Sequence, residues 1–274
     1  MQEAGTGKGL IADTHVHLYR CYDIPDTIRK AIEHLRELAR AAQQPDALPV
    51  LCLTERHDHH VFDELKSGRL RLDPGKVSAL PDEPAGLRID GGSGEGCAYL
   101  LAGRQVITRE RIEVLGLAMA SFVEDGLPLE DTVARVRAQG GLPVLSWAPG
   151  KWFFGRGRIV GAFISRSAPG DLLLGDTSLR PLFWGEPRLM RAGRRRGLRV
   201  VSGSDPLPFA EDARWAGRVA TVYAPAPMDE ARPVAAIARR LLQDTPLRER
   251  AGARLCPSQV ALRLLRNRKA RGMP

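Results

Sequence analysis

The sequence predicts one α/β domain with a mainly parallel β-sheet, and two observations support this prediction. Seven short apolar runs recur along the chain, and segments with helical spacing lie between them. The runs cover residues 9–13, 48–54, 98–103, 142–146, 171–176, 198–205 and 218–224. Alternation of strand and helix is typical of parallel sheets. Seven strands suit a (β/α) barrel, with a doubly wound sheet as the alternative.

The segments between the runs have the periodicity of amphipathic helices. In residues 26–43, apolar side chains such as Ile28 and Ile32 recur every three or four positions. The other segments are 129–140, 186–197 and 229–244. Gly140 and Gly197 stand where a helix would take its C-terminal cap. These patterns predict four helices between the strands.

Three further regions depart from the alternation of strand and helix. Residues 63–96 are predicted to form an elaborated loop, with short strands, after the second strand. Residues 99–119 are typical of two strands joined by a short turn. Residues 257–274 are expected to form a basic C-terminal helix or tail. With no linker or internal repeat between these regions, residues 1–274 are expected to form a single domain.

Composition restricts the class of protein and its partners. The formal net charge of +9 favours an anionic partner, either a small substrate or nucleic acid, although no zinc-finger, basic-zipper or RNP signature is present. No apolar run approaches the roughly 18 residues of a membrane span, and the N-terminus lacks a signal-peptide core. We therefore expect a cytoplasmic protein without membrane contacts. The four scattered cysteines predict free thiols rather than a zinc or redox motif.

Polar side chains follow the predicted strands, where the active sites of parallel barrels gather. Asp13, His15 and His17 alternate along the first strand, so they should point to one face. After the later runs come Thr54, Glu55, Arg56, His57, Gln105, Ser146, Trp147, Asp176, Ser204 and Asp205. Imidazole and carboxylate donors suit zinc, manganese or iron. The alternative is a buried polar cluster in which His15 and His17 only form hydrogen bonds.

These patterns resemble the PHP (polymerase and histidinol phosphatase) family and, more distantly, the amidohydrolases and TatD-type hydrolases. The similarity spans roughly residues 10–210 and lies in motifs. The stretches that carry it are DTHVHLYRCYD, LTERHDHH, AGRQVITRERIEVLGL, GGLPVLSWAPGKW and SGSDPL. The resemblance implies a (β/α)7 barrel, a cluster of up to three metal ions, and hydrolysis of phosphoesters.

The sequence departs from the family pattern at three expected ligands. Gln105 stands at the position of a bridging glutamate, and it can offer an oxygen but no negative charge. Trp147 and Leu207 replace histidines and cannot bind a metal. The donors that remain for one or two divalent ions are His15, His17, Asp13, Glu113 and Asp205.

Catalytic and substrate-binding roles follow from the same positions. Asp205 is the candidate ligand or general base, and His57 is the second catalytic candidate. Arginine and lysine match phosphate and carboxylate groups, so the side chains predicted to bind an anionic substrate are Arg56, Asp176, Arg180 and Lys151, with Arg156 beside them. Asp176 and Arg180 could instead pair with each other. The predicted function is a metal-dependent phosphoester hydrolase. The alternatives are a barrel that binds a ligand without catalysis and a nucleic-acid-associated protein.

Overall fold

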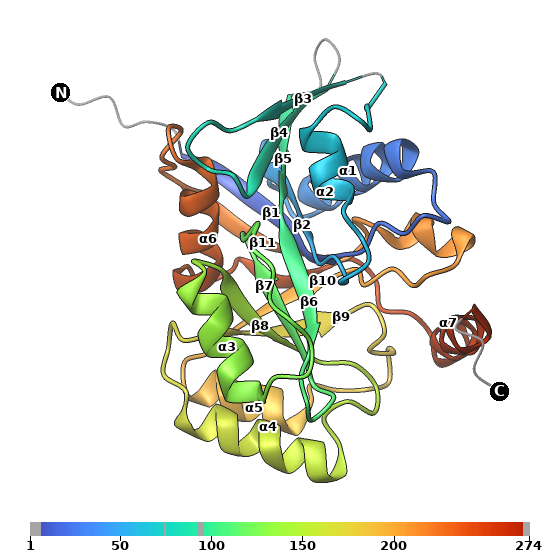
Figure 1. Cartoon of the computed structure of the whole chain (residues 1–274), viewed down its shortest axis with the longest axis vertical. Coiled ribbons are helices and arrows are strands. Elements are labelled where there is room, and N and C mark those ends of the chain that lie inside the picture. The colour runs from blue at the N-terminus through green and yellow to red at the C-terminus, as the bar shows by residue number, and fades with distance from the viewer. Residues whose placement is uncertain (1–6, 74, 92–95, 271–274) are drawn as a thin grey trace.

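The computed structural model describes residues 7–73, 75–91 and 96–270, which form two β-sheets covered by helices (Figure 1). The larger sheet has the strand order β12-β11-β1-β2-β5-β4-β3, and the smaller has the order β10-β9-β8-β7-β6. The strands are β1 (Lys8–Val16), β2 (Leu48–Leu53), β3 (Lys76–Ala79), β4 (Gly86–Asp90), β5 (Cys97–Leu101), β6 (Gly103–Ile107), β7 (Glu113–Leu117), β8 (Leu142–Ser146), β9 (Leu173–Thr177), β10 (Arg199–Gly203), β11 (Ala220–Ala226) and β12 (Arg248–Ala251).

Parallel and antiparallel pairs are mixed in both sheets. In the larger sheet, β1, β2 and β5 run parallel, whereas β11 is antiparallel to β1 and the hairpin β3–β4 continues antiparallel from β5. In the smaller sheet, β8, β9 and β10 run parallel and β7 is antiparallel to both of its neighbours. The described part of residues 63–96 therefore extends the sheet through β3 and β4.

The prediction of a (β/α)7 barrel is wrong, because the described strands do not close into one. Closure would need continuous ladders from β10 to β1 and from β6 to β2. However, β1 already pairs with β11 and β2, and β2 already pairs with β1 and β5, so neither has a free hydrogen-bonding edge. Among the described residues, isolated backbone bonds join the two sheets in place of a ladder, such as that from the Asp205 N–H to the His15 carbonyl oxygen and that from the Glu55 N–H to the Gly103 carbonyl oxygen.

The helices are α1 (Ile24–Ala41), α2 (Val61–Lys66), α3 (Leu129–Ala138), α4 (Phe154–Arg166), α5 (Arg188–Arg195), α6 (Pro233–Gln243) and α7 (Pro257–Ala270), with a 3₁₀ turn, η1 (Ala210–Trp215). Helix α1 shows how the sequence sets their ends. The Asp23 carboxylate accepts a hydrogen bond from the Asp26 N–H, and Pro25 occupies the first turn, where its missing N–H costs nothing.

The described residues form two apolar cores, the larger of which also includes side chains of the five-stranded sheet such as Leu115 and Leu173. The larger core packs α1 and α6 against the seven-stranded sheet, and residues such as Ile28 and Leu35 are fully buried in it. The second core packs α3, α4 and α5 against the five-stranded sheet, around residues such as Leu145 and Leu174 (Figure 1). The polar ends of β1 and β10 meet where the two sheets join.

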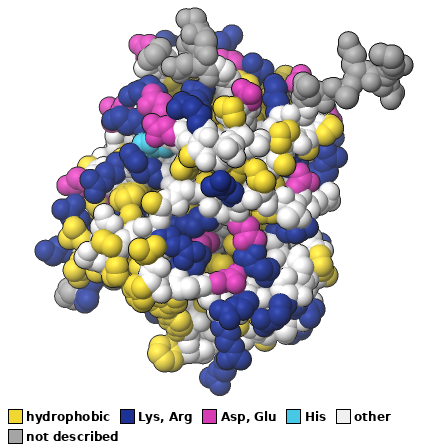
Figure 2. Space-filling model, turned by 180° about the vertical axis from the view of Figure 1, so that it is seen from behind, with side chains coloured by type: hydrophobic (Ala, Val, Ile, Leu, Met, Phe, Trp, Pro, Cys, Tyr) yellow, Lys and Arg dark blue, Asp and Glu magenta, His cyan; other side chains and the backbone are white. Residues whose placement is uncertain are grey.

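The surface agrees with the basic composition. Lys and Arg side chains gather over the lower half of the face in Figure 2, the end of the molecule that α4 and α5 form in Figure 1. Among the described residues, no helix combines the length and the apolar character that crossing a membrane requires.

Candidate metal centre

Two histidines of the first strand and an aspartate after β10 converge where the sheets meet. His15, His17 and Asp205 are buried, and each offers one ligand atom within 4.8 Å of the others. The two imidazole Nε2 atoms lie 3.1 Å apart, and the Asp205 Oδ1 lies 3.6 Å from the first and 3.8 Å from the second. This group could therefore bind a metal ion.

Gln105 adds a fourth donor from β6, the edge strand of the five-stranded sheet. Its Oε1 lies 3.1 Å from His15 Nε2 and 3.0 Å from His17 Nε2. A four-coordinate zinc ion with bonds of about 2.1 Å separates its ligand atoms by about 3.4 Å. The distances from 3.0 to 3.8 Å in this cluster bracket that spacing. Hydrogen bonds can satisfy only some of these pairs, whereas a cation at the centre satisfies all of them. The residues present fit a divalent metal ion.

The surroundings of His17 favour the neutral form, which is the form that a metal needs. Burial, with repulsion from the neighbouring His15, lowers the pKa of His17 well below its ordinary value. On His15, the Nδ1 atom lies 3.4 Å from the Ser146 hydroxyl, which leaves Nε2 for the cluster. A hydrogen-bond partner on the far nitrogen is the arrangement that fixes a metal-binding histidine.

The Gly-Ser-Asp stretch after β10 explains how Asp205 reaches the histidines. A Cβ atom on Gly203 would lie 2.4 Å from both the N and the Cβ of His15, so only glycine allows β10 this close to β1. Ser204 then donates its N–H, at 2.8 Å, and its hydroxyl to the Asp13 carboxylate. Asp205 itself has a positive φ of 48°, which is uncommon for a residue other than glycine. Strained backbone of this kind clusters at functional sites.

Asp13 supports the cluster without joining it. Its carboxylate also accepts hydrogen bonds from the Gly217 N–H at 2.9 Å and the His15 N–H at 3.2 Å. Complete burial raises the Asp13 pKa to about 6, although these hydrogen bonds favour the ionised form. Asp13 therefore ties β1 to the chain after β10.

A cleft of about 330 Å³ opens beside Gln105. Four of its lining side chains are cationic, two are acidic and one is imidazole: Arg56, Arg111, Lys151, Arg156, Glu113, Asp125 and His57. The Lys151 Nζ lies 2.8 Å from the Glu113 Oε1, so that carboxylate forms an ion pair. The His57 side chain is 59% exposed and stands outside the donor cluster. The cleft thus combines an excess of positive charge with direct access to Gln105.

Asp176 and Arg180 do not reach this cleft. They form a buried bidentate pair, with Arg180 Nε 2.8 Å from Asp176 Oδ1 and Nη2 2.5 Å from Oδ2. The Arg250 Nη1 lies 3.3 Å from the same carboxylate. Trp147 is also buried, against Trp184, where it packs rather than binds.

Sequence reasoning missed Arg111 and Asp125 in the cleft. Arg111 lies in the turn between β6 and β7 with a positive φ of 61°, and Asp125 accepts a hydrogen bond from the Ile107 N–H at 2.8 Å. The predicted hairpin in 99–119 could have pointed to Arg111, because the turn of a hairpin lies at one rim of the sheet.

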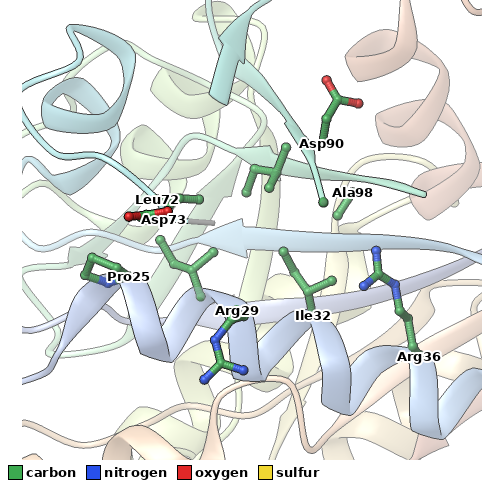
Figure 3. Close-up of a pocket in the computed structure, with 11 residues that line it drawn as sticks. Pro25, Arg29, Ile32, Arg36, Leu72, Asp73, Asp90 and Ala98 are labelled. Carbon is green, nitrogen blue, oxygen red and sulfur yellow. The ribbon is translucent and has the colours of Figure 1, made fainter. Parts of the chain in front are cut away.

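A small cavity of about 40 Å³ lies apart from the cleft, between α1 and the strands β4 and β5. Ile32, Asp90 and their neighbours line it (Figure 3), and it has room for about one water molecule.

Comparisons with known proteins support the fold but assign no family. No sequence-family profile matches the chain, and a search of curated proteins finds no relative. The chain is similar to the crystal structure of PsfC from Pseudomonas syringae PB-5123, with a TM-score of 0.55 and 16% identity over 97% of this chain and 98% of that one. The chain therefore shares the overall fold of PsfC.

Two structures of Endonuclease Q are similar over a smaller part of their length. One is a complex with a 27-mer duplex substrate that has an abasic lesion at the active site, with a TM-score of 0.42. The other is the lesion-specific endonuclease from Pyrococcus furiosus, with a TM-score of 0.43. Both are 11% identical to this chain. Each alignment covers 89% of this chain, but only 58% of the first endonuclease chain and 57% of the second. Scores at this level bear on neither the fold nor the chemistry of this chain.

Proposed function

We propose that the chain is a divalent-metal-dependent hydrolase of phosphoesters and a divergent member of the PHP family. The observation that carries the proposal is the convergence of His15, His17, Asp205 and Gln105 next to a cationic cleft. The order of the Asp-x-His-x-His and Gly-Ser-Asp motifs along the chain supports the family assignment.

In this proposal the four donors hold one ion of zinc, manganese or iron. Two imidazoles and a carboxylate suit all three metals, and the amide oxygen completes four ligands. When bound, such an ion polarises a phosphoryl oxygen and lowers the pKa of a water molecule. Gln105 brings no charge, so the site keeps a larger net positive charge than a site with a second carboxylate. That excess favours an anionic substrate.

The cleft residues would bind and orient the substrate. Arg56, Arg111 and Arg156 present guanidinium groups that match phosphate oxygens, and Lys151 adds a point charge. Glu113 holds Lys151 in place through their ion pair. His57 lines the same cleft and is exposed there, so it could donate a proton to the leaving-group oxygen of a bound phosphoester. We assign it that role and leave Asp13 as a positioning residue.

Metal content and phosphoesterase activity test the proposal together. Elemental mass spectrometry on the wild type and on His15→Ala/His17→Ala should give about one metal per chain in the former and none in the latter. Hydrolysis of p-nitrophenyl phosphate and bis(p-nitrophenyl) phosphate with added zinc, manganese or iron should depend on the same two histidines. Wild-type protein that binds no metal after reconstitution contradicts the proposal.

A second candidate function is ligand binding without turnover. The buried, apolar Trp147 and Leu207 favour it, because they occupy positions at which the resembled family has metal ligands. A wild type that binds metal and phosphate but hydrolyses neither ester with any of the three metals would support this candidate.

A further inference from the structure

A second hollow, lined by aromatic rings, lies between α4 and α5. Its volume is about 570 Å³, and its rings are Trp147, Trp152, Phe153, Phe154 and Trp184. We call it the aromatic groove. Of the described residues that line it, none is acidic. None of the four metal-donor residues lines this groove. The groove and the cationic cleft take residues from the same short segment, since Lys151 and Arg156 line the cleft while Trp152 and Phe153 line the groove.

At the surface the groove presents the exposed Phe154 ring and the half-buried Phe153 and Trp184 rings, whereas Trp147 and Trp152 are buried. Phe153 stacks on Trp184 with an interplanar angle of 17° and a centroid distance of 5.7 Å, and Phe183 lies against Trp184 at 6.1 Å. The Phe154 side chain is 94% exposed, and its backbone has a positive φ of 53°. A bulky residue in that conformation is strained, and exposure of a large apolar ring to water brings no stability. The arrangement holds a ring outward without a folding benefit.

The rim of the groove is positively charged, and the charges are unpaired. Arg158 of α4 and Arg188 and Arg195 of α5 line the groove and are exposed. They form no ion pair with any residue in the described ranges. By contrast, Arg191 and Arg194 on the same helix pair with acidic residues. Since residues seven apart share a helix face, Arg188 and Arg195 point the same way, toward the groove that both line.

We propose that the aromatic groove binds single-stranded nucleic acid. The exposed Phe154 ring and the half-buried Phe153 and Trp184 rings provide stacking surfaces for unpaired bases, and the unpaired arginines provide contacts for the phosphates between them. A double helix offers phosphates but keeps its bases stacked inside, so it leaves the rings unused. The lower end of the molecule, where the groove lies between α4 and α5, has both basic and hydrophobic side chains on the face in Figure 2. This binding does not depend on hydrolysis at the metal centre.

Fluorescence anisotropy tests the proposal with a labelled oligothymidylate of about 12 nucleotides, a length that fits known single-strand sites. EDTA in the buffer prevents cleavage. Replacement Phe154→Ala should weaken binding about tenfold, the usual effect of removing one stacking ring. The double variant Arg188→Ala/Arg195→Ala should weaken binding and reduce the slope of log K against log salt by about 1.4. The control Arg191→Ala, on the same helix but paired with Glu186, should bind like the wild type.

Four results would overturn the proposal. The first is wild-type affinity in both groove variants. The second is a duplex of the same length that binds as tightly as the single strand. The third is displacement of the oligomer by thymidine monophosphate at similar concentration, which would identify a free nucleotide as the ligand. The fourth is a dimer in light scattering that Phe154→Ala dissociates, which would identify a second copy of the chain. Because His15→Ala/His17→Ala should bind the oligomer normally, failure here is distinguishable from failure of the proposed hydrolase.

Discussion

Two aspartates on neighbouring strands have opposite surroundings, although the sequence places both at strand ends. The Asp205 carboxylate, two residues after β10, faces the imidazoles of His15 and His17, and no Lys or Arg among the described residues pairs with it, although Arg263 Nη2 donates to the Asp205 backbone carbonyl oxygen at 3.1 Å. Asp176 in β9 is saturated: Arg180 binds both of its oxygens, Arg250 contacts one, and the Thr177 N–H donates to the other.

The difference follows from which face of the sheet each side chain occupies. Leu174, two residues before Asp176 in β9, packs in the core beneath α4 and α5, and alternation turns Asp176 to that same outer side. Asp205 turns instead toward β1, where the sheets join. A carboxylate at a strand end in the sequence therefore predicts a position at the rim of the sheet, but not the face of the sheet on which its side chain lies. A carboxylate that converges with other donor atoms, as Asp205 does, indicates a ligand site, whereas a carboxylate neutralised by arginines, as Asp176 is, indicates a structural role.

The largest expected effect is on stability, at the saturated aspartate. Asp176→Ala leaves Arg180 and Arg250 buried without their carboxylate, so the free energy of unfolding should fall by about 3–5 kcal/mol. Urea denaturation measures this loss. The control is Glu130→Ala, which removes an exposed partner of Arg166 and should cost less than about 1 kcal/mol. Equal losses in the two variants would contradict the structural role of Asp176.

The converse holds at Asp205, where metal binding should change and stability should not. Asp205→Asn keeps the size of the side chain but removes the negative charge, so zinc affinity should fall at least about 100-fold, or about 2.7 kcal/mol. Competition with a chromophoric chelator measures it. The free energy of unfolding without metal should stay near the wild-type value. An unaltered zinc affinity would remove Asp205 from the ligand set and erase the contrast with Asp176.

The sequence was informative about strands and donors because these depend on local pattern. The predicted run at 142–146 has the bounds of β8, and the predicted helix at 129–140 corresponds to α3. His15 and His17 were found because two-residue spacing fixes their common face in any strand. Asp205 was found because it ends the apolar run at 198–205 and matches a Gly-Ser-Asp motif of the resembled family. The structure adds the steric reason for the glycine, which is the close approach of Gly203 to His15.

What the sequence did not predict depends on partners far along the chain. Barrel closure failed because β11 and β5 occupy the outer edges of β1 and β2, and no local pattern reveals which edges are taken. Helix α4 was missed because Gly155 and Gly157 in its first turns weaken the helical signal. Strand β12 was missed because its sequence, Arg-Glu-Arg-Ala, is that of a polar edge strand.

A larger side chain at Gly203, two residues before Asp205, should disturb the metal site by moving the backbone. Gly203→Ala places a methyl group against His15, so β10 must move away and carry Asp205 with it. We expect a loss of about 1–3 kcal/mol in the free energy of unfolding together with weaker zinc binding. Gly155→Ala is the matched control, because nothing lies within 4 Å of its added Cβ and alanine favours a helix. Unchanged zinc affinity in Gly203→Ala would show that the approach of the strands does not set the site.

The smallest expected effect tests whether the site is limited by charge or by shape. Gln105→Glu keeps the length of the side chain and replaces a neutral oxygen donor with a charged one, 3.0 to 3.1 Å from the two imidazoles. Because ligand charge tunes metal affinity, zinc binding should tighten about tenfold, or about 1.4 kcal/mol. The same chelator competition measures it, with Gln105→Ala as the control that should bind more weakly than the wild type. If Gln105→Glu binds no more tightly, the amide serves to orient the imidazoles rather than to bind the ion. In that case His15, His17 and Asp205 would be the metal ligands. The contrast between the two aspartates would then be greater, because the Asp176 carboxylate is already neutralised by two arginines and has no oxygen left for a metal ion.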